Sequence, residues 1–205
     1  TDVPAQMTHR QAARKAVAMC VSDFAAKGVE PQSYLVSLGL PRGFPDDGVV
    51  QLSKGFKDAS TEWNLKLLGG DTNEASELVV DCVMLGFTRK FVPRSGAKAG
   101  QYVVVSGYFG YSPSGLRILD GASADPTFKK KAVQSVLEPK PKLQLGVALS
   151  KYLSSSIDSS DGLAICLHTI ASMSGVGIMV NELPCRDELV RFAERNGLSF
   201  EELVL

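Results

Sequence analysis

The spacing of hydrophobic and polar positions predicts helices alternating with strands along the whole chain. A capping-box pattern, with Thr8 as the N-cap and Gln11 three residues later, predicts the start of an amphipathic helix. Gly28 is placed to end that helix in the left-handed conformation that glycine adopts readily. The inner face of this helix is expected to carry Ala12, Ala16, Met19 and Cys20.

Further elements follow from the same periodicities. A long helix is expected to be capped by Asp46 or Asp47 and to run to about Asn64, with Val50 buried. Phe56 and Trp63 should be buried with it. Strands are expected at 33–40, 65–68, 78–88, 101–106, 155–157 and 176–181. Further helices are expected at 113–119, 126–137, 142–153, 161–174 and 185–196.

This order of elements, without an internal repeat of 20–50 residues, predicts an α/β or α+β fold. The polar, glycine-containing stretch at 93–100 is the best candidate for a domain boundary. We therefore expect an N-terminal domain at 1–92 and a C-terminal α/β domain at 93–205. At 205 residues the chain is long enough for two small hydrophobic cores.

Composition narrows the classes of partner and the compartment. The 22 basic residues balance the 22 acidic ones, so no net charge favours nucleic acid or an anionic membrane surface. No apolar run approaches the roughly 18 residues that a membrane-spanning helix needs. The four cysteines are scattered and form no Cys-x-x-Cys pair, which favours reduced thiols. We expect a cytoplasmic protein that binds neither nucleic acid nor membranes.

Aspartates in glycine-containing turns are the most informative chemical feature. Asp158 and Asp161 lie three residues apart where a short strand is expected to lead into a helix. Asp23 and Asp71 are expected in similar turns. Mg²⁺ prefers carboxylate oxygens together with phosphate and water, and free backbone N–H groups at a helix start favour phosphate. Each aspartate also has a structural interpretation: Asp161 as an N-cap, Asp71 as a turn former, Asp23 as a solvated residue.

The basic and glycine residues leave alternatives open. Arg94 could offer a planar, permanently charged fork to a polyphosphate, or could be an ordinary linker charge. Gly107 and Gly110 could let the backbone approach a nucleotide, or could simply turn the chain. The sequence contains no Gly-x-x-x-x-Gly-Lys-Ser/Thr, which excludes a P-loop mechanism.

Taken in order, the motifs resemble those of thiamine-monophosphate kinase, above all its archaeal form. The resemblance rests on Ser-Asp-Phe-Ala-Ala-Lys-Gly at 22–28, Gly-Gly-Asp-Thr at 69–72, Arg-Ser-Gly-Ala-Lys-Ala-Gly at 94–100 and Ile-Asp-Ser-Ser-Asp-Gly-Leu at 157–163. It implies the two-domain fold of the aminoimidazole ribonucleotide synthetase-like superfamily, with N-terminal strands that form a barrel in a homodimer. It also implies Mg²⁺ and ATP in a cleft between the domains.

The resemblance also implies roles for particular residues. It assigns metal binding to Asp23, Asp71, Asp158 and Asp161, nucleotide binding to Gly70, Asp71, Arg94 and Ser160, substrate binding to Asp2, and catalysis to Asp161 and Arg94. The implied reaction is in-line transfer of the γ-phosphoryl group of ATP to thiamine monophosphate. Because the acceptor is already an anion, such a reaction would rest on positioning and charge neutralisation.

The sequence departs from the family at its ends. The Gly-Asp-Asp motif of the family's N-terminal region and the Gly-Gly-Glu-Asp/Glu-Tyr segment that would follow Leu205 are missing. We therefore expect a trimmed form of a longer protein, inactive by itself. Two other functions remain open: another ATP-using member of the superfamily, such as an aminoimidazole-ribonucleotide-synthetase-like ligase, and a non-catalytic nucleotide-binding scaffold.

Overall fold

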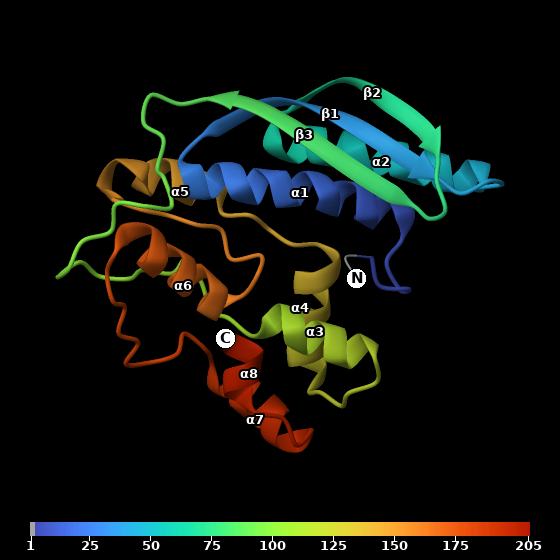
Figure 1. Cartoon of the computed structure of the whole chain (residues 1–205). Coiled ribbons are helices and arrows are strands. Elements are labelled where there is room, and N and C mark those ends of the chain that lie inside the picture. The colour runs from blue at the N-terminus through green and yellow to red at the C-terminus, as the bar shows by residue number, and fades with distance from the viewer. Residues whose placement is uncertain (1–2) are drawn as a thin grey trace.

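Three strands and two long helices form one layered half of the molecule (Figure 1). The computed structural model describes residues 3–205. The elements of this half are α1 (His9–Lys27), β1 (Glu30–Leu40), α2 (Asp46–Trp63), β2 (Lys66–Glu74) and β3 (Val79–Phe87). The other half is mainly helical, with α3 (Tyr111–Leu119), α4 (Pro126–Leu137), α5 (Leu143–Leu149), a 3₁₀ turn (Ser150–Tyr152), α6 (Leu163–Ser174), α7 (Asp187–Arg195) and α8 (Phe200–Val204).

The sheet has the order β2-β1-β3, with β2 parallel and β3 antiparallel to the central strand. The register between β1 and β2 shifts after Tyr34, which pairs with Leu67, so that Leu35 pairs with Gly69. Gly69 has φ = 148°, a backbone conformation that favours glycine at such an irregularity. The shift explains why a glycine pair stands inside a strand, where the sequence predicts a turn.

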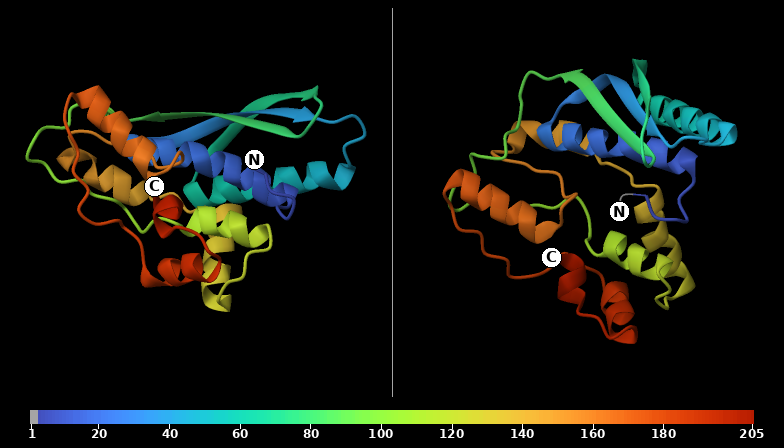
Figure 2. Two further views of the ribbon diagram at one scale, coloured as in Figure 1. Left: turned by 60° about the horizontal axis from the view of Figure 1, so that its bottom comes forward. Right: turned by 45° about the vertical axis from the view of Figure 1, so that its right-hand side comes forward.

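Helices α1 and α2 cover one face of the sheet and enclose the first hydrophobic core (Figures 1 and 2). Tyr34 on β1 is fully buried, and its hydroxyl donates to the Phe56 carbonyl at 3.0 Å and lies 2.9 Å from Ser60 Oγ. A buried tyrosine needs such a polar partner. The core comprises Ala13, Val17, Val21, Tyr34, Val36, Leu52, Phe56, Ala59 and Leu65.

A second core lies among α3, α4, α6, α7 and α8. Phe128 packs its ring against Phe192 at a centroid distance of 5.1 Å. The Tyr111 hydroxyl donates to Glu188, and burial together with that carboxylate raises the pKa of Tyr111 to about 12. Lys131 also bonds Glu188, at 3.1 Å, so this carboxylate joins α3, α4 and α7.

Helix α5 belongs to the C-terminal half in sequence but packs against α1. Leu143 adds to the first core, and Gly146 lies so close to α1 that an added Cβ would be 2.1 Å from the Ala25 carbonyl oxygen. The two halves are therefore joined by helix packing as well as by the chain. The division at residue 92 stays a prediction.

The helix predictions are confirmed in position, with three corrections of detail. Met19 is 42% exposed and Val50 is 48% exposed, so neither is a core residue. The buried stripe of α1 is rotated from the predicted one and consists of Ala12, Ala13, Val17, Ala18, Val21 and Ala25. The N-cap of α2 is Pro45, which has no side-chain hydrogen bond to offer, and Asp46 and Asp47 lie in the first helical turn instead.

The predicted strands at 101–106, 155–157 and 176–181 are wrong, since these segments are irregular within residues 3–205. Large apolar side chains of 101–106 and 176–181 are exposed to solvent: Tyr102 is 95% exposed, Val104 72% and Met179 84%. A strand requires a neighbour that pairs with its backbone, which local sequence does not supply. In the described part of the chain, no helix is both long and apolar enough to cross a membrane.

Candidate metal and phosphate site

The C-terminal end of α1 supplies the first functional side chain. Asp23 lies in the last turns of this helix, not in a turn of the chain as the sequence predicts. The helix ends at Lys27 and is closed by Gly28 at φ = 65°, whose N–H donates to the carbonyl oxygens of Ala25 and Phe24. Asp23 is therefore held on the helix, about one turn before its end.

The segment before α6 supplies the second group. Asp158 lies on an irregular segment. Its backbone carbonyl accepts a hydrogen bond from the Cys166 thiol at 3.1 Å. Asp161 stands directly before Gly162, which is the N-cap of α6 at φ = 97°. Asp161 is therefore not the N-cap, and its carboxylate remains exposed beside the start of the helix.

Asp23 and Asp158 come together although they are 135 positions apart in the sequence. Partial desolvation raises the pKa of Asp23, and the charge of the neighbouring Asp158 carboxylate raises that pKa further. Two carboxylates in contact repel each other unless a proton or a cation lies between them. The fold thus brings together two carboxylates that are distant in the sequence.

Two cations border the pair. The charge of Arg94 partly offsets the rise in the pKa of Asp23. Burial, and then the charge of Arg94, lower the pKa of Lys27. Lys27 is half-buried, and its Nζ donates to the Ser156 carbonyl oxygen at 2.7 Å. Sequence reasoning missed Lys27 as a functional residue. Its position in the 22–28 motif, four residues after Asp23, is the signal that could have found it.

The chemistry of these groups fits Mg²⁺ with a phosphate ligand. Mg²⁺ in phosphate-handling sites is commonly held by one or two carboxylates, with phosphate and water completing an octahedron. The Asp23–Asp158 contact offers two such oxygen donors, and Arg94 and Lys27 offer positive charge beside them. Among residues 3–205, no group of three or more His, Cys, Asp or Glu side chains is arranged to hold a metal ion.

The remaining predicted site residues are not part of the Asp23–Asp158 contact. Asp71 is inside β2, paired in register with the exposed Ser37, and its carboxylate accepts from Thr72 N at 2.8 Å and Asn73 Nδ2 at 2.9 Å. Gly70 is paired with Val36, and an added Cβ would lie 1.8 Å from the Val36 carbonyl oxygen, so the sheet itself requires glycine there.

Ser160 is exposed in the turn beside Asp161. Gly110, which sequence reasoning left open, begins α3 at φ = 93° against Leu189, so its conformation is explained by packing. Asp2 lies outside the described residues.

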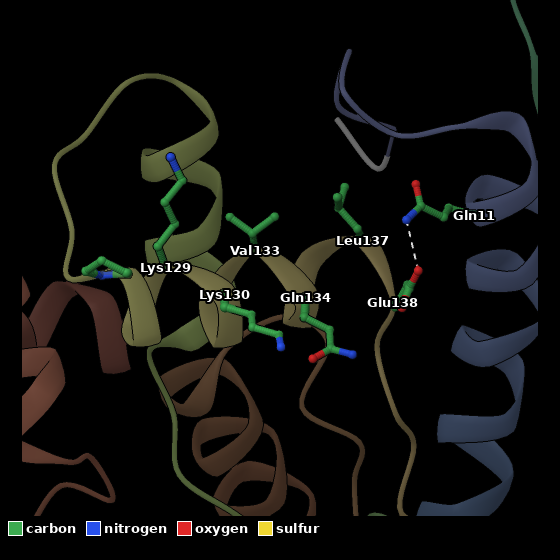
Figure 3. Close-up of a pocket in the computed structure, with 8 residues that line it drawn as sticks. Gln11, Lys129, Lys130, Val133, Gln134, Leu137 and Glu138 are labelled. Carbon is green, nitrogen blue, oxygen red and sulfur yellow. Dashed lines mark hydrogen bonds between the residues drawn. The ribbon is translucent and has the colours of Figure 1, made fainter.

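A separate hollow of about 530 Å³ lies between α4 and the start of α1 (Figure 3). The exposed side of α4 lines it with Lys129 and Lys130, and Gln11 closes one end through a 3.0 Å hydrogen bond to Glu138. None of the predicted site residues lines this hollow. We therefore assign the candidate site to the Asp23–Asp158 contact.

The sheet with helices on one face, and the acidic contact at the end of α1, were compared with known families and solved structures. The family described as "AIR synthase related protein, N-terminal domain" matches residues 1–88, which contain this sheet and its two helices, so this half has the fold of an aminoimidazole ribonucleotide synthetase-related protein. The solved structure "AaThiL complexed with AMPPCP and TMP" superposes with a TM-score of 0.90 at 30% identity, over 98% of this chain and 66% of that one.

Relatives of known name identify the family within this class. Thiamine-monophosphate kinase of Nitrosopumilus maritimus is 39% identical over 96% of this chain and 64% of its own length. The Pyrococcus horikoshii enzyme of the same name is 36% identical over 98% of this chain and 67% of its length. The chain belongs to the thiamine-monophosphate kinase family, and it spans about two thirds of the length of these relatives.

Proposed function

We propose that the protein containing this chain transfers the γ-phosphoryl group of ATP to thiamine monophosphate, which gives thiamine diphosphate. Family membership supports the reaction, and the relative solved with TMP and the ATP analogue AMPPCP supports the pair of substrates. The observation on this chain that carries the proposal is the Asp23–Asp158 contact bordered by Arg94 and Lys27. We also propose a cytoplasmic location, where both substrates would be available.

The proposed roles follow from the chemistry of each side chain. Asp23 and Asp158 would hold one Mg²⁺, and Asp161 and Asp71 would serve further Mg²⁺ ions, since no three of these carboxylates are grouped within residues 3–205. Mg²⁺ bound there would neutralise charge on the ATP phosphates. The Arg94 guanidinium would orient the transferring phosphoryl group, while Gly70 and Ser160 would line the nucleotide and Asp2 the acceptor. Because the acceptor phosphate is an anion, these groups need only align it and offset charge repulsion.

The experiment that tests this function uses the protein at the full length of its relatives, with Mg²⁺, ATP and thiamine monophosphate, and measures thiamine diphosphate. We expect product to form, and we expect the 205-residue form to be inactive or badly impaired. Nucleotide binding without product would point to another acceptor within the superfamily. Absence of both would favour a non-catalytic scaffold.

We further propose that the protein is a homodimer through the outer face of the sheet. Helices cover the other face (Figure 2), and this one exposes apolar side chains of β1 and β3. An apolar sheet face left to water is unfavourable, and a second copy of the same face would bury it. The exposed residues are Leu35 on β1 and Val79, Val83, Leu85 and Phe87 on β3.

Val83→Asp is therefore expected to weaken dimerisation by at least about 100-fold, because each dimer would bury two unpaired carboxylates. Sedimentation equilibrium measures the change. Val50→Asp is the matched control, since Val50 is 48% exposed on α2 and Val83 is 55% exposed on β3. Equal association constants for the two variants would rule out this face as the interface.

A further inference from the structure

Three segments that are far apart in the sequence meet at Lys27 and are joined by a closed ring of hydrogen bonds. The backbone carbonyl of Lys27 accepts from Val92 N at 3.1 Å. The next residue, Pro93, accepts from Ser156 N at 2.9 Å. The Ser156 carbonyl then accepts from Lys27 Nζ at 2.7 Å, which closes the ring.

Each segment of this ring carries one charged group of the candidate site. The end of α1 carries Asp23, the segment after Val92 carries Arg94, and the segment after Ser156 carries Asp158. Val92 is 1% exposed, so the ring is anchored in the protein interior. Two of its links are backbone bonds, which no substitution of a side chain removes. Lys27 Nζ supplies the remaining link.

We infer that Lys27 is a positioning residue, whose ammonium group holds the 154–162 segment against α1 so that Asp158 meets Asp23. This inference rests on the proposed function, because the paired carboxylates are the proposed metal ligands. Half-burial makes the ammonium costly to desolvate, and the hydrogen bond to the Ser156 carbonyl compensates in part. The Lys27 ammonium group therefore links α1 to the segment that contains Ser156.

The change in metal affinity on removal of the Lys27 ammonium group distinguishes a positioning role from a purely electrostatic one. A positive charge beside two carboxylates repels a divalent cation, so its removal should tighten metal binding if charge were its only effect. If Lys27 positions the carboxylates, its removal should weaken metal binding. Substitutions of residues that orient metal ligands cost about 10–100-fold in affinity, and we expect about 10-fold for Lys27→Met.

The test uses the full-length protein with Mn²⁺ alone as the probe, followed by electron paramagnetic resonance of the free ion. Lys27→Met should weaken Mn²⁺ binding about 10-fold, and Lys27→Arg, which keeps charge and donors, should restore most of it. Lys90→Met is the matched control. Lys90 Nζ also donates to a backbone carbonyl, that of Lys151 at 2.9 Å, but is exposed and borders no predicted ligand.

A second readout needs no metal. Hydrogen exchange of the metal-free protein should be faster at 154–160 in Lys27→Met than in wild type, and unchanged there in Lys90→Met. Tighter or unaltered Mn²⁺ binding in Lys27→Met would overturn the inference, as would unaltered exchange at 154–160. If wild type binds no Mn²⁺, the proposed function fails, and the exchange comparison alone decides whether Lys27 holds the segment.

Discussion

Asp23→Asn is expected to weaken Mg²⁺-dependent ATP binding by at least about 100-fold, since substitutions that merely orient metal ligands already cost 10–100-fold. Asp158→Asn should do the same, because the two carboxylates contact each other and would share the ion. The effect is measured by calorimetric titration of the full-length protein with ATP at saturating Mg²⁺. Asp120→Asn, which changes an exposed carboxylate at the end of α3, should bind as wild type does.

Asp23→Asn should leave the metal-free protein as stable as wild type or make it more stable. The pKa of Asp23 is raised in the folded protein, so the folded state binds more protons than the unfolded state as the carboxyl titrates. The contribution of Asp23 to stability therefore falls as pH rises through the ordinary carboxyl range and stays unfavourable above the raised pKa. An amide removes this penalty.

Thermal unfolding at neutral pH, once in EDTA and once with Mg²⁺ and ATP, distinguishes the loss of a metal ligand from damage to the fold. Asp23→Asn should melt at or above the wild-type temperature and should lose the stabilisation that Mg²⁺ and ATP give to wild type. A normal ligand-induced shift in both asparagine variants would contradict the assignment of this contact as a metal site.

Gly55→Ala is expected to destabilise the protein by about 2 kcal/mol or more, which lowers the melting temperature by about 4–8 °C. An added Cβ would lie 2.2 Å from the Arg10 carbonyl oxygen and 2.8 Å from the Ala13 Cβ, at the place where α2 crosses α1. Because the nearest atom is helix backbone, the two helices would have to separate. Alanine in a helix normally gains about 1 kcal/mol over glycine, and the steric cost must exceed that gain.

Gly177→Ala is the matched control, since an added Cβ there has no neighbour within 4 Å in the described residues. Its effect should stay within about 0.5 kcal/mol. Differential scanning calorimetry of both variants measures the difference. A melting temperature for Gly55→Ala equal to that of Gly177→Ala would mean that α1 and α2 pack less tightly than the structure has them.

Local signals in the sequence account for most of the helices. The capping box at Thr8 is confirmed, with Gln11 N donating to Thr8 Oγ1 and the Gln11 side chain accepting from Thr8 N. Ser199 likewise caps α8, and Gly28 ends α1 as predicted. These signals lie within a few residues of the features they specify, and the hydrogen bonds that they form do not depend on the rest of the fold.

The segments at 101–106 and 176–181 have the composition of strands but no sheet to join within residues 3–205. Strand formation depends on a partner that can lie anywhere in the sequence, so periodicity alone overpredicts strands. The reverse error occurs at Gly69 and Gly70, where turn residues lie inside β2 because a register shift and a close backbone approach require glycine.

The sequence by itself determined which residues are candidates for chemistry: a set of aspartates of the kind that binds Mg²⁺, an arginine, and no P-loop. Only the tertiary structure decided which of them meet. Asp23 contacts Asp158 beside Arg94, Asp71 lies apart on the sheet, and Lys27 enters through a hydrogen bond that spans 129 positions. Residue type follows from the chain, but contact between distant residues follows from how helices and segments pack.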